Sequence, residues 1–260
     1  MANTIYWGQA AVNNTNGFGQ GAKIGGSSFS NLKSILLDGI DDFVDCGDND
    51  NLSFGDTSSD FPFAFSVWAK VDNLTTSHVL LEKRDASSNY EYIFYIGSDG
   101  AIYNNIYSDG AALNRRGRKT STGLISINTW YHIVMTYDGQ GGTNASDGIK
   151  IYLDGLRVDN ANNQKNSYVA MRNTSNPFKI GEFIAGNIDE VSVFNSELSQ
   201  SDVTSIYGGG VPSSLSSYSS LISWWRCGDS DTSPILSDNG SGGNDGTMTN
   251  FTTFSTDIPT

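Results

Sequence analysis

The sequence predicts an all-β fold in which two antiparallel sheets pack face to face as a sandwich. Short segments alternate apolar with polar side chains, which is the period of a half-buried strand. Asp-Gly pairs recur along the chain and predict tight turns, because glycine adopts a positive φ without steric cost. Glycine is abundant, at 29 of 260 residues, while charged residues make up 17%. This composition is typical of many strands joined by polar turns.

The first group of expected strands lies before residue 108. Residues 63–71 alternate large apolar side chains with small or polar ones, as a half-buried strand does. Residues 90–96 and 101–107 flank the turn sequence Ser-Asp-Gly and therefore predict a hairpin. Shorter strands are expected at residues 35–38, 42–45 and 79–83.

The second group of expected strands follows residue 129. Residues 130–137 and 149–153 each end at an Asp-Gly pair, and residues 156–158 return from the second of these turns. Residues 178–181 form a short strand, whereas residues 186–194 alternate strongly between apolar and polar side chains. Each segment therefore has the period expected of a strand with one buried face.

One short helix is expected over residues 199–207. Ser199 and Asp202 resemble a capping box, and the three glycines that begin at Gly208 would end the helix. A helix of this length is not stable alone. We therefore expect its apolar side to pack against the sandwich.

Residues 1–33 differ from the rest of the chain, because they contain too few aliphatic residues to build a core. We expect an extended arm that orders on a partner surface, either another copy of the chain or a different protein; a tail without a partner is the alternative. The aromatic residues that would make this contact are Tyr6, Trp7 and Phe18. Residues 34–260 would form the sandwich, with a Ser-rich linker at 211–220 and a closing strand and loop at 221–250.

The composition argues against two classes of partner. The formal net charge is −13, whereas sequence-independent binding to nucleic acid needs a positive surface. The sequence contains no run of about 18 apolar residues that could span a membrane. The first residues lack the basic and apolar regions of a signal peptide. We therefore expect a virion component, or an extracellular domain without its leader.

No residue pattern predicts catalysis. Glycoside hydrolysis needs two carboxylates about 5–10 Å apart on either side of the scissile bond. Asp189 and Glu190 are adjacent, so a regular strand would point them to opposite faces. His132 lies within a strand and is expected to make structural hydrogen bonds. Cys46 and Cys227 are expected to be free, with a disulfide as the alternative.

One cluster of basic residues, at 115–119, is expected on a loop after the strand at 101–107. A solvated loop is one interpretation, and contact with an acidic glycan, an acidic subunit or nucleic acid is the other. Tyrosines of the preceding hairpin could stack on sugar rings, although alternation sends about half of them into the core. The candidate ligand-binding residues are Tyr103, Tyr107, Arg115, Arg116 and Arg118.

Taken in chain order, the motifs resemble the laminin-G-like and pentraxin-like branch of the concanavalin-A-like lectin and glucanase superfamily. The segments that carry the resemblance are 36–44 (LLDGIDDFV), 65–70 (FSVWAK), 129–139 (TWYHIVMTYDG), 150–155 (KIYLDG), 186–195 (GNIDEVSVFN) and 199–207 (SQSDVTSIY). Each motif is weak alone, but their common order and spacing are specific. The resemblance implies an antiparallel jelly-roll sandwich.

One departure from the family order predicts a circular permutation. In the family, a Trp-containing strand and an Asn/Gly-rich loop precede the first motif, whereas here their likeness lies at residues 221–250. We expect this segment to close the sandwich of its own chain, because an open edge promotes aggregation; completion of a neighbouring subunit is the alternative. Closure would bring Trp224 and Trp225 near residues 35–44 and Cys227 toward Cys46.

The resemblance also implies a cofactor. Family members often bind Ca²⁺ through aspartates and backbone carbonyls, which are the oxygen ligands that this ion prefers. Asp189 matches a position used in this way, and Asp38, in an Asp-Gly turn, is a plausible second ligand. The alternative is that both side chains cap turns.

The arm and the Trp-Trp-Arg-x-Gly-Asp segment resemble domains of virion proteins of tailed phages. We therefore expect a non-catalytic virion structural protein, part of the capsid decoration or of the tail or fibre. It would contact other virion proteins or copies of itself through the arm, and would stabilise the particle or adhere to surface glycan. The alternatives are a secreted carbohydrate-binding lectin, with or without a need for Ca²⁺, and a glycoside hydrolase.

Overall fold

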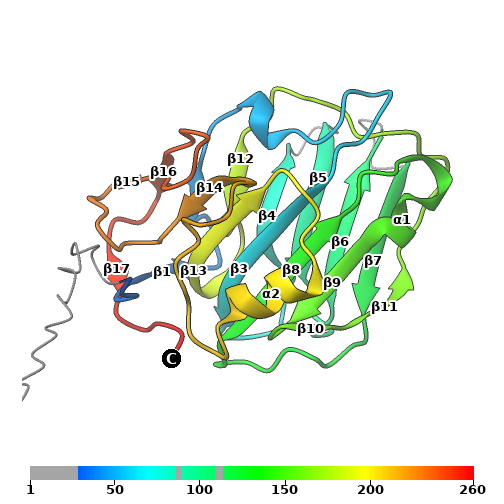
Figure 1. Ribbon diagram of the computed structural model, residues 1–260. Helices are drawn as coiled ribbons and strands as arrows, with labels where there is room; N and C mark the ends of the chain where they lie inside the picture. Colours follow the sequence, from blue (N-terminus) through cyan, green and yellow to red (C-terminus); the bar gives the residue numbers. More distant parts are fainter. Residues whose placement is uncertain (1–28, 86–88, 109–113) are drawn as a thin grey trace, which may run out of the picture. The chain divides into compact units, whose positions relative to one another are not determined.

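The computed structural model describes residues 29–85, 89–108 and 114–260 of the chain. Residues 31–260 form one compact unit. Within it, two antiparallel sheets of eight and nine strands pack against each other, with short helical segments beside them (Figure 1). The predicted all-β sandwich is thus confirmed. The arm residues Tyr6, Trp7 and Phe18 lie outside the described residues.

The eight-stranded sheet is arranged around β13 (Ala185–Phe194), which pairs with β3 along one side. On its other side β13 pairs first with β1 and then with β14. The strand order is β10-β9-β8-β3-β13-β1-β17, with β14 paired to β13. The bounds of the other strands are β1 (Ser34–Asp38), β3 (Phe63–Val71), β8 (Tyr131–Tyr137), β9 (Ile149–Leu153), β10 (Leu156–Arg157), β14 (Leu221–Trp225) and β17 (Phe254–Ser255).

The nine-stranded sheet has the order β11-β7-β6-β5-β4-β12-β2-β16-β15. Its strands are β2 (Phe43–Asp45), β4 (His78–Arg84), β5 (Tyr90–Ile96), β6 (Ile102–Tyr107), β7 (Arg115–Thr120), β11 (Asp159–Asn162), β12 (Phe178–Ile180), β15 (Ile235–Leu236) and β16 (Gly246–Thr249). The expectation that residues 115–119 lie on a loop is wrong, because they belong to β7, which pairs with β6 and β11.

Aromatic side chains from both sheets fill the space between the layers. Phe63 of β3 stacks on Phe54, with ring centroids 4.2 Å apart. Phe178 of β12 stacks on Trp225 of β14 at 5.5 Å. Such pairs add to the free energy of burial. Trp225 belongs to the same core cluster as residues 35 and 44, whereas Trp224 is not part of that cluster.

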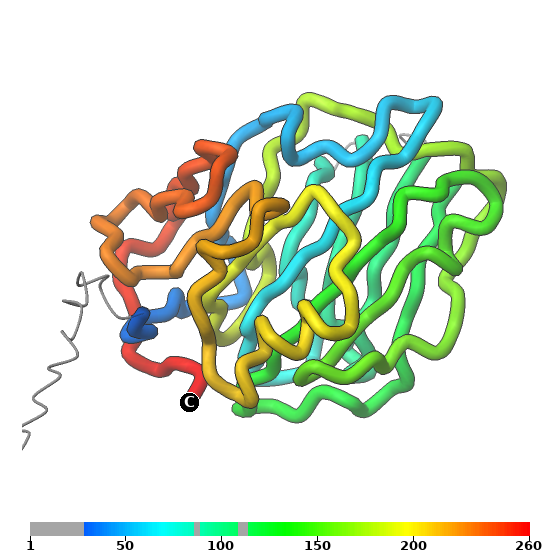
Figure 2. The backbone as a smooth tube through the Cα atoms, in the orientation of Figure 1, coloured from blue at the N-terminus to red at the C-terminus, as the bar shows by residue number. Residues whose placement is uncertain are grey.

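The C-terminal segment takes part in both sheets of its own chain. β14 pairs with β13, β16 pairs with β2, and β17 pairs with β1. In Figure 2 the orange and red end of the tube accordingly lies beside the blue strands. Cys46 and Cys227 are both buried and free, so the alternative of a disulfide between them is not realised.

The expected short helix is α2 (Gln200–Tyr207). Ser199 forms a capping box with Asp202, and the helix ends at Gly208, where φ is 63°. The Tyr207 ring stacks at 5.9 Å on Trp68 of β3, so α2 lies on the outer face of the eight-stranded sheet (Figure 1). The remaining described helical segments are single turns: η1 (Asp50–Leu52), η2 (Gly142–Asn144) and α1 (Ala145–Gly148). Within the described residues, no helix is both long and apolar enough to cross a membrane.

Candidate functional site

Four tyrosines lie together on the outer face of the nine-stranded sheet. Tyr92 and Phe94 of β5 point into the core, so Ile93 and Tyr95 point outward. Tyr90 reaches the same face because the pairing of β4 with β5 shifts register between Tyr92 and Tyr90, and it packs in a separate cluster with Ile93 and Tyr107. Tyr95 of β5 and Tyr103 of β6 are cross-strand partners, with ring centroids 4.9 Å apart and an interplanar angle of 7°. A second pair lies alongside, because the rings of Tyr90 and Tyr107 are 5.2 Å apart. We name these four residues the tyrosine surface.

Amide and guanidinium groups border the tyrosine surface. Asn163 Nδ2 donates to Asn105 Oδ1 at 2.9 Å, and Arg115 Nη2 donates to Asn163 Oδ1 at 3.3 Å. Asn105 pairs with Gly117 across β6 and β7. A Cβ atom on Gly117 would lie 2.5 Å from Asn105 Oδ1, so this glycine makes room for the amide. The result is a set of polar groups beside flat aromatic rings.

The hydroxyl groups of Tyr103 and Tyr107 remain protonated at neutral pH. Burial raises the pKa of Tyr107 to about 12. Burial, together with the hydrogen bond to Asp99, also raises the pKa of Tyr103 to about 12. The Tyr103 hydroxyl donates to Asp99 Oδ2 at 2.8 Å. Lys119 Nζ lies 5.9 Å from the centroid of the Tyr103 ring, within the range of a cation–π contact.

Strand alternation divides the five candidate ligand-binding residues between two faces. Tyr103, Tyr107 and Arg115 lie on the outer face, where Arg115 pairs with Tyr107 across the strands. Arg116 points the other way and donates to the carbonyl oxygens of residues 143, 166 and 115. Arg118 is held by Asp159 and Asn162. The structure thus brings together only part of the predicted set.

A cavity of about 280 Å³ opens on the same sheet, next to β4 and β12. It is lined by Glu82, Arg84, Asp85, Lys179, Glu182 and Phe183, and we name it the carboxylate pocket. Glu82 and Lys179 are cross-strand partners. Arg84 Nε donates to Glu82 Oε2, and Lys179 Nζ donates to Glu182 Oε1 at 2.8 Å. The Arg84 guanidinium also lies 5.8 Å from the centroid of the Tyr90 ring, which links the pocket to the tyrosine surface.

The two glutamates of the carboxylate pocket share one proton at neutral pH. Burial raises the pKa of Glu82 to about 8, and a hydrogen bond with the Glu182 carboxyl contributes to this rise. Burial opposes ionisation of Glu182 as well, but hydrogen bonds from Glu82 and Lys179 outweigh it and lower the Glu182 pKa. The proton therefore resides mainly on Glu82. No sequence motif signals this pair, because the two residues lie in unrelated segments.

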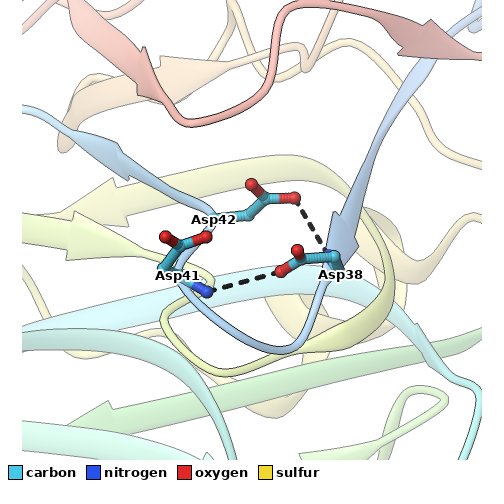
Figure 3. Close-up of side chains that lie close together, drawn as sticks. All are labelled: Asp38, Asp41 and Asp42. Atoms are coloured by element: carbon cyan, nitrogen blue, oxygen red, sulfur yellow. Dashed lines mark hydrogen bonds between the residues drawn. The ribbon is translucent and has the colours of Figure 1, made fainter.

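Three aspartates in the turn between β1 and β2 could hold a cation. One carboxylate oxygen each of Asp38, Asp41 and Asp42 lies within 4.8 Å of the others (Figure 3). Asp38 Oδ1 accepts hydrogen bonds from the backbone N–H groups of Ile40 and Asp41, at 2.8 and 3.4 Å. Asp42 Oδ2 accepts one from the Asp38 N–H at 3.0 Å. The carboxylates thus cap the turn, as the alternative interpretation of Asp38 expects.

Asp189 is not part of this acidic turn. Asp38 pairs with Ala185 of β13, whereas Asp189 lies four residues farther along that strand. Asp189 is fully buried and accepts hydrogen bonds from Asn31 Nδ2 at 2.7 Å and from the Glu190 N–H at 2.8 Å. The structure therefore does not bring together the two aspartates proposed as calcium ligands. It places Asp41 and Asp42 beside Asp38, a grouping that the sequence motifs do not predict.

The simple alternation expected at Asp189 and Glu190 does not hold. β13 shifts register between Asp189 and Ser192, and Glu190 has a φ of 46°. Both acidic residues are buried, and Glu190 accepts hydrogen bonds from Trp224 Nε1 at 2.5 Å and Arg226 Nε at 3.2 Å. These contacts hold the two carboxylates inside the protein.

His132 makes a structural hydrogen bond, as the sequence predicts. Its Nε2 lies 2.8 Å from Ser66 Oγ, and the residue is fully buried. Burial lowers the pKa of His132 to about 3. The imidazole is therefore neutral under physiological conditions.

Comparison with known proteins relates the chain to one fold family. Residues 39–204 match a laminin-G-type family model described as the concanavalin A-like lectin/glucanases superfamily. A candidate carbohydrate-binding protein from Bacteroides ovatus has a TM-score of 0.58 and 17% identity, over 89% of this chain and 62% of its own. Our chain thus spans about 62% of the length of that protein. The comparison with curated proteins gave no match.

Two further solved structures are more distant. The CBM40 domain of the Ruminococcus gnavus IT-sialidase, bound to α2,3-sialyllactose, has a TM-score of 0.47 and 10% identity, over 69% of this chain and all (100%) of its own. A pentraxin from Limulus polyphemus has a TM-score of 0.38 and 13% identity, over 66% and 84%. At such identities, likeness to a solved structure speaks to the fold alone.

Proposed function

The chain belongs to the concanavalin A-like lectin/glucanases superfamily, and we propose that it is a non-catalytic domain that binds glycan on the outer face of its nine-stranded sheet. The observation that carries this proposal is the stacked pair of Tyr95 and Tyr103 beside the Asn105 amide. The apolar C–H face of a sugar ring packs well on a flat aromatic ring. A tyrosine also offers a hydroxyl group for a hydrogen bond.

The polar border of the tyrosine surface supports a ligand rich in hydroxyl groups. Amide side chains both donate and accept hydrogen bonds, as Asn105 and Asn163 do in their contact with each other. Arg115 contributes a buried Nε–H that has no acceptor among the described residues. A sugar hydroxyl or carboxylate would supply that acceptor. This complementarity favours glycan over a purely apolar ligand.

The arrangement of carboxylates favours binding over hydrolysis. Catalytic pairs in glycosidases are separated by about 5–9.5 Å. The Glu82 and Glu182 carboxyls are instead in hydrogen-bonding contact, which leaves no room for a scissile bond between them. Asp189 and Glu190 are both buried. These geometries support a domain that recognises its ligand without cleaving it.

A glycan array with the full chain tests the proposed function. Tyr103→Ala should lower glycan binding at least tenfold and leave the far-ultraviolet spectrum unchanged. Phe61→Ala is the matched control, because Phe61 is also exposed but lines a different pocket, with Pro62 and Ile222. If Phe61→Ala abolishes binding and Tyr103→Ala does not, the binding face has been misassigned.

Display of this domain on a virion stays a proposal that rests on the sequence of residues 1–33. The same holds for contacts with other virion proteins or with further copies of the chain. Deletion of residues 1–30 should abolish association with particles while the sandwich stays folded. Unchanged incorporation of the truncated chain would contradict the role of the arm.

A further inference from the structure

Among the described residues, one oxygen of Glu82 has no donor apart from the proton that Glu82 shares with Glu182. Glu82 Oε2 accepts a hydrogen bond from Arg84, whereas Glu82 Oε1 is buried and has no donor among the described residues. The Glu82 side chain is only 1% exposed. The group that faces it is the Glu182 carboxyl, and a hydrogen bond between two carboxyl groups requires that one of them is protonated. Because an unsatisfied buried acceptor is costly, the pocket needs either a shared proton or a donor from a ligand.

Phe183 stands at the pocket in a backbone conformation that bulky residues rarely adopt. Its φ is 61°, in the left-handed region. The turn that contains it is closed by a hydrogen bond from the Ile184 N–H to the Gly181 carbonyl at 3.2 Å. Turns of this kind usually place glycine or asparagine at a residue with positive φ. Phe183 is 44% exposed, so packing in the core does not explain why a phenyl ring stands here.

We propose that the carboxylate pocket is a subsite for one neutral sugar ring, held by two hydroxyl groups on Glu82 and Glu182 and by its apolar face on Phe183. Two hydroxyl groups on neighbouring carbons can donate one hydrogen bond to each carboxylate. This inference rests on the proposed function, because it makes the pocket one subsite of the same glycan-binding face.

The charges in the carboxylate pocket favour a neutral ring over a charged one. Arg84 donates to Glu82, and Lys179 donates to Glu182. Both cationic side chains therefore already have a carboxylate partner. An acidic group on the ligand would have to compete with these ion pairs. The hydroxyl groups of a neutral sugar need only the second oxygen of each carboxyl group, because the ion pairs use Glu82 Oε2 and Glu182 Oε1.

The subsite predicts that affinity rises with pH. The charged groups that line the pocket with Glu82 are Arg84, Asp85, Lys179 and Glu182. Two further titratable groups contact these residues: Asp45 of β2 lies opposite Lys179, and the Tyr90 ring of β5 lies against Arg84. Burial and the Glu182 carboxyl raise the pKa of Glu82 to about 8. A sugar that donates to both carboxylates must displace the shared proton. Its affinity should therefore rise about tenfold from pH 7 to pH 9.

The test is an NMR titration of the full chain with the methyl α-glycosides of glucose, galactose and mannose. At least one glycoside should produce saturable shifts of the backbone amides at residues 182–184. Phe183→Gly preserves the turn and should weaken this binding at least tenfold, whereas Phe183→Tyr should retain it. Glu82→Gln keeps the shape of the side chain but cannot ionise, so the rise in affinity with pH should disappear.

Two results would overturn the subsite: no shift at residues 182–184 with any of the three glycosides up to their solubility limits, or equal affinity in Phe183→Gly and the parent chain. The Tyr103→Ala variant tests the proposed function independently of the subsite. If the glycosides fail to bind the pocket but Tyr103→Ala still lowers binding on the glycan array, the face binds glycan and the subsite alone is wrong.

Discussion

Lys83 and Glu91 form an ion pair that is sealed from solvent inside the sandwich. Lys83 Nζ lies 2.8 Å from Glu91 Oε1, and both side chains are 0% exposed. The same ammonium donates to Asp48 Oδ1 at 2.8 Å, Ser53 Oγ at 2.9 Å and the Thr174 carbonyl oxygen at 2.8 Å. One lysine of β4 thereby fixes two loops that are far apart in the sequence.

Removing the buried ammonium should strongly destabilise the fold. Lys83→Met leaves the Glu91 carboxylate buried without its cation, so we expect the free energy of unfolding to fall by about 3–5 kcal/mol. Glu91→Gln should have a smaller effect, because Lys83 keeps its bond to Asp48. Guanidinium denaturation measures both variants, and the double variant should recover part of the loss. A loss below about 1 kcal/mol for Lys83→Met would contradict the role assigned to this pair.

The stability of Glu82→Gln relative to the parent chain should depend on pH. The folded state raises the pKa of Glu82 from 4.5 to about 8, so the folded state holds a proton that the unfolded chain releases. The stabilisation from this proton is complete below pH 4.5 and is lost as pH rises toward 8. The free energy of unfolding of Glu82→Gln, relative to that of the parent chain, should therefore rise by at most about 1.4 kcal/mol per pH unit in that range. Urea denaturation from pH 5 to pH 8 measures the difference, and a difference that does not change with pH would refute the shared proton.

Gly117→Ala should disturb both the sheet and the tyrosine surface. The new Cβ atom would lie 2.2 Å from the Asn104 carbonyl oxygen, which is a backbone atom, and 2.5 Å from Asn105 Oδ1. We expect a loss of about 1–3 kcal/mol in stability, together with weaker glycan binding because Asn105 must move. Gly123→Ala is the control: Gly123 has a φ of 73° but nothing within 4 Å of its Cβ position. Backbone strain alone should cost about 1–2 kcal/mol there, with unchanged binding on the array.

Calcium binding stays a prediction, and the acidic turn is the place to test it. We expect Ca²⁺ to raise the Tm above that in EDTA, because binding to the folded state alone stabilises it. Asp41→Asn should remove this response, since it takes one charge from the three carboxylates that lie within 4.8 Å of one another. Asp189→Asn is the comparison, because Asp189 lies apart from that turn. A response to Ca²⁺ that is lost in Asp189→Asn and kept in Asp41→Asn would place the ion elsewhere.

Local periodicity predicts the strands that bury one apolar face, and it fails where the buried face is polar. β3, β8 and β13 follow the predicted segments closely, and so does the helix that Ser199 caps. β7 was not predicted as a strand because its inward-facing Arg116 is charged and breaks the apolar alternation. The Arg116 guanidinium donates hydrogen bonds to carbonyl oxygens inside the protein. Strict alternation at Glu190 failed because a bulge interrupts β13. Nothing in the one-dimensional pattern marks either exception.

The candidate site could be predicted only in part, because it depends on how distant strands pair. The hairpin of β5 and β6 places Tyr95 opposite Tyr103, and this pairing follows from the turn between the two strands. The pairing of β4 with β12 is not local, and it alone brings Glu182 to Glu82. The permuted C-terminus was predictable from the order of the motifs. Its exact partners, β13, β2 and β1, were not.

Arg115 and Arg116 are neighbours in the sequence, and their substitution should have opposite consequences. Arg115 lies on the outer face beside Tyr107, so Arg115→Ala should weaken glycan binding and change stability by less than about 1 kcal/mol. Arg116 is 5% exposed, and its Nε and Nη1 atoms donate to the carbonyl oxygens of Thr143 and Asn166 at 3.0 and 2.9 Å. Arg116→Ala leaves these acceptors without a donor, so we expect the free energy of unfolding to fall by about 2–3 kcal/mol.

Urea denaturation and the glycan array, applied to both arginine variants, separate the two roles. At a temperature where both variants are folded, Arg116→Ala should bind as the parent chain does, because its side chain points away from the tyrosine surface. The reverse result, in which Arg116→Ala loses binding while Arg115→Ala keeps it, would mean that the ligand lies at the edge of the sandwich near Thr143. In that case, the face of β7 on which a side chain lies would not determine whether it contacts the glycan.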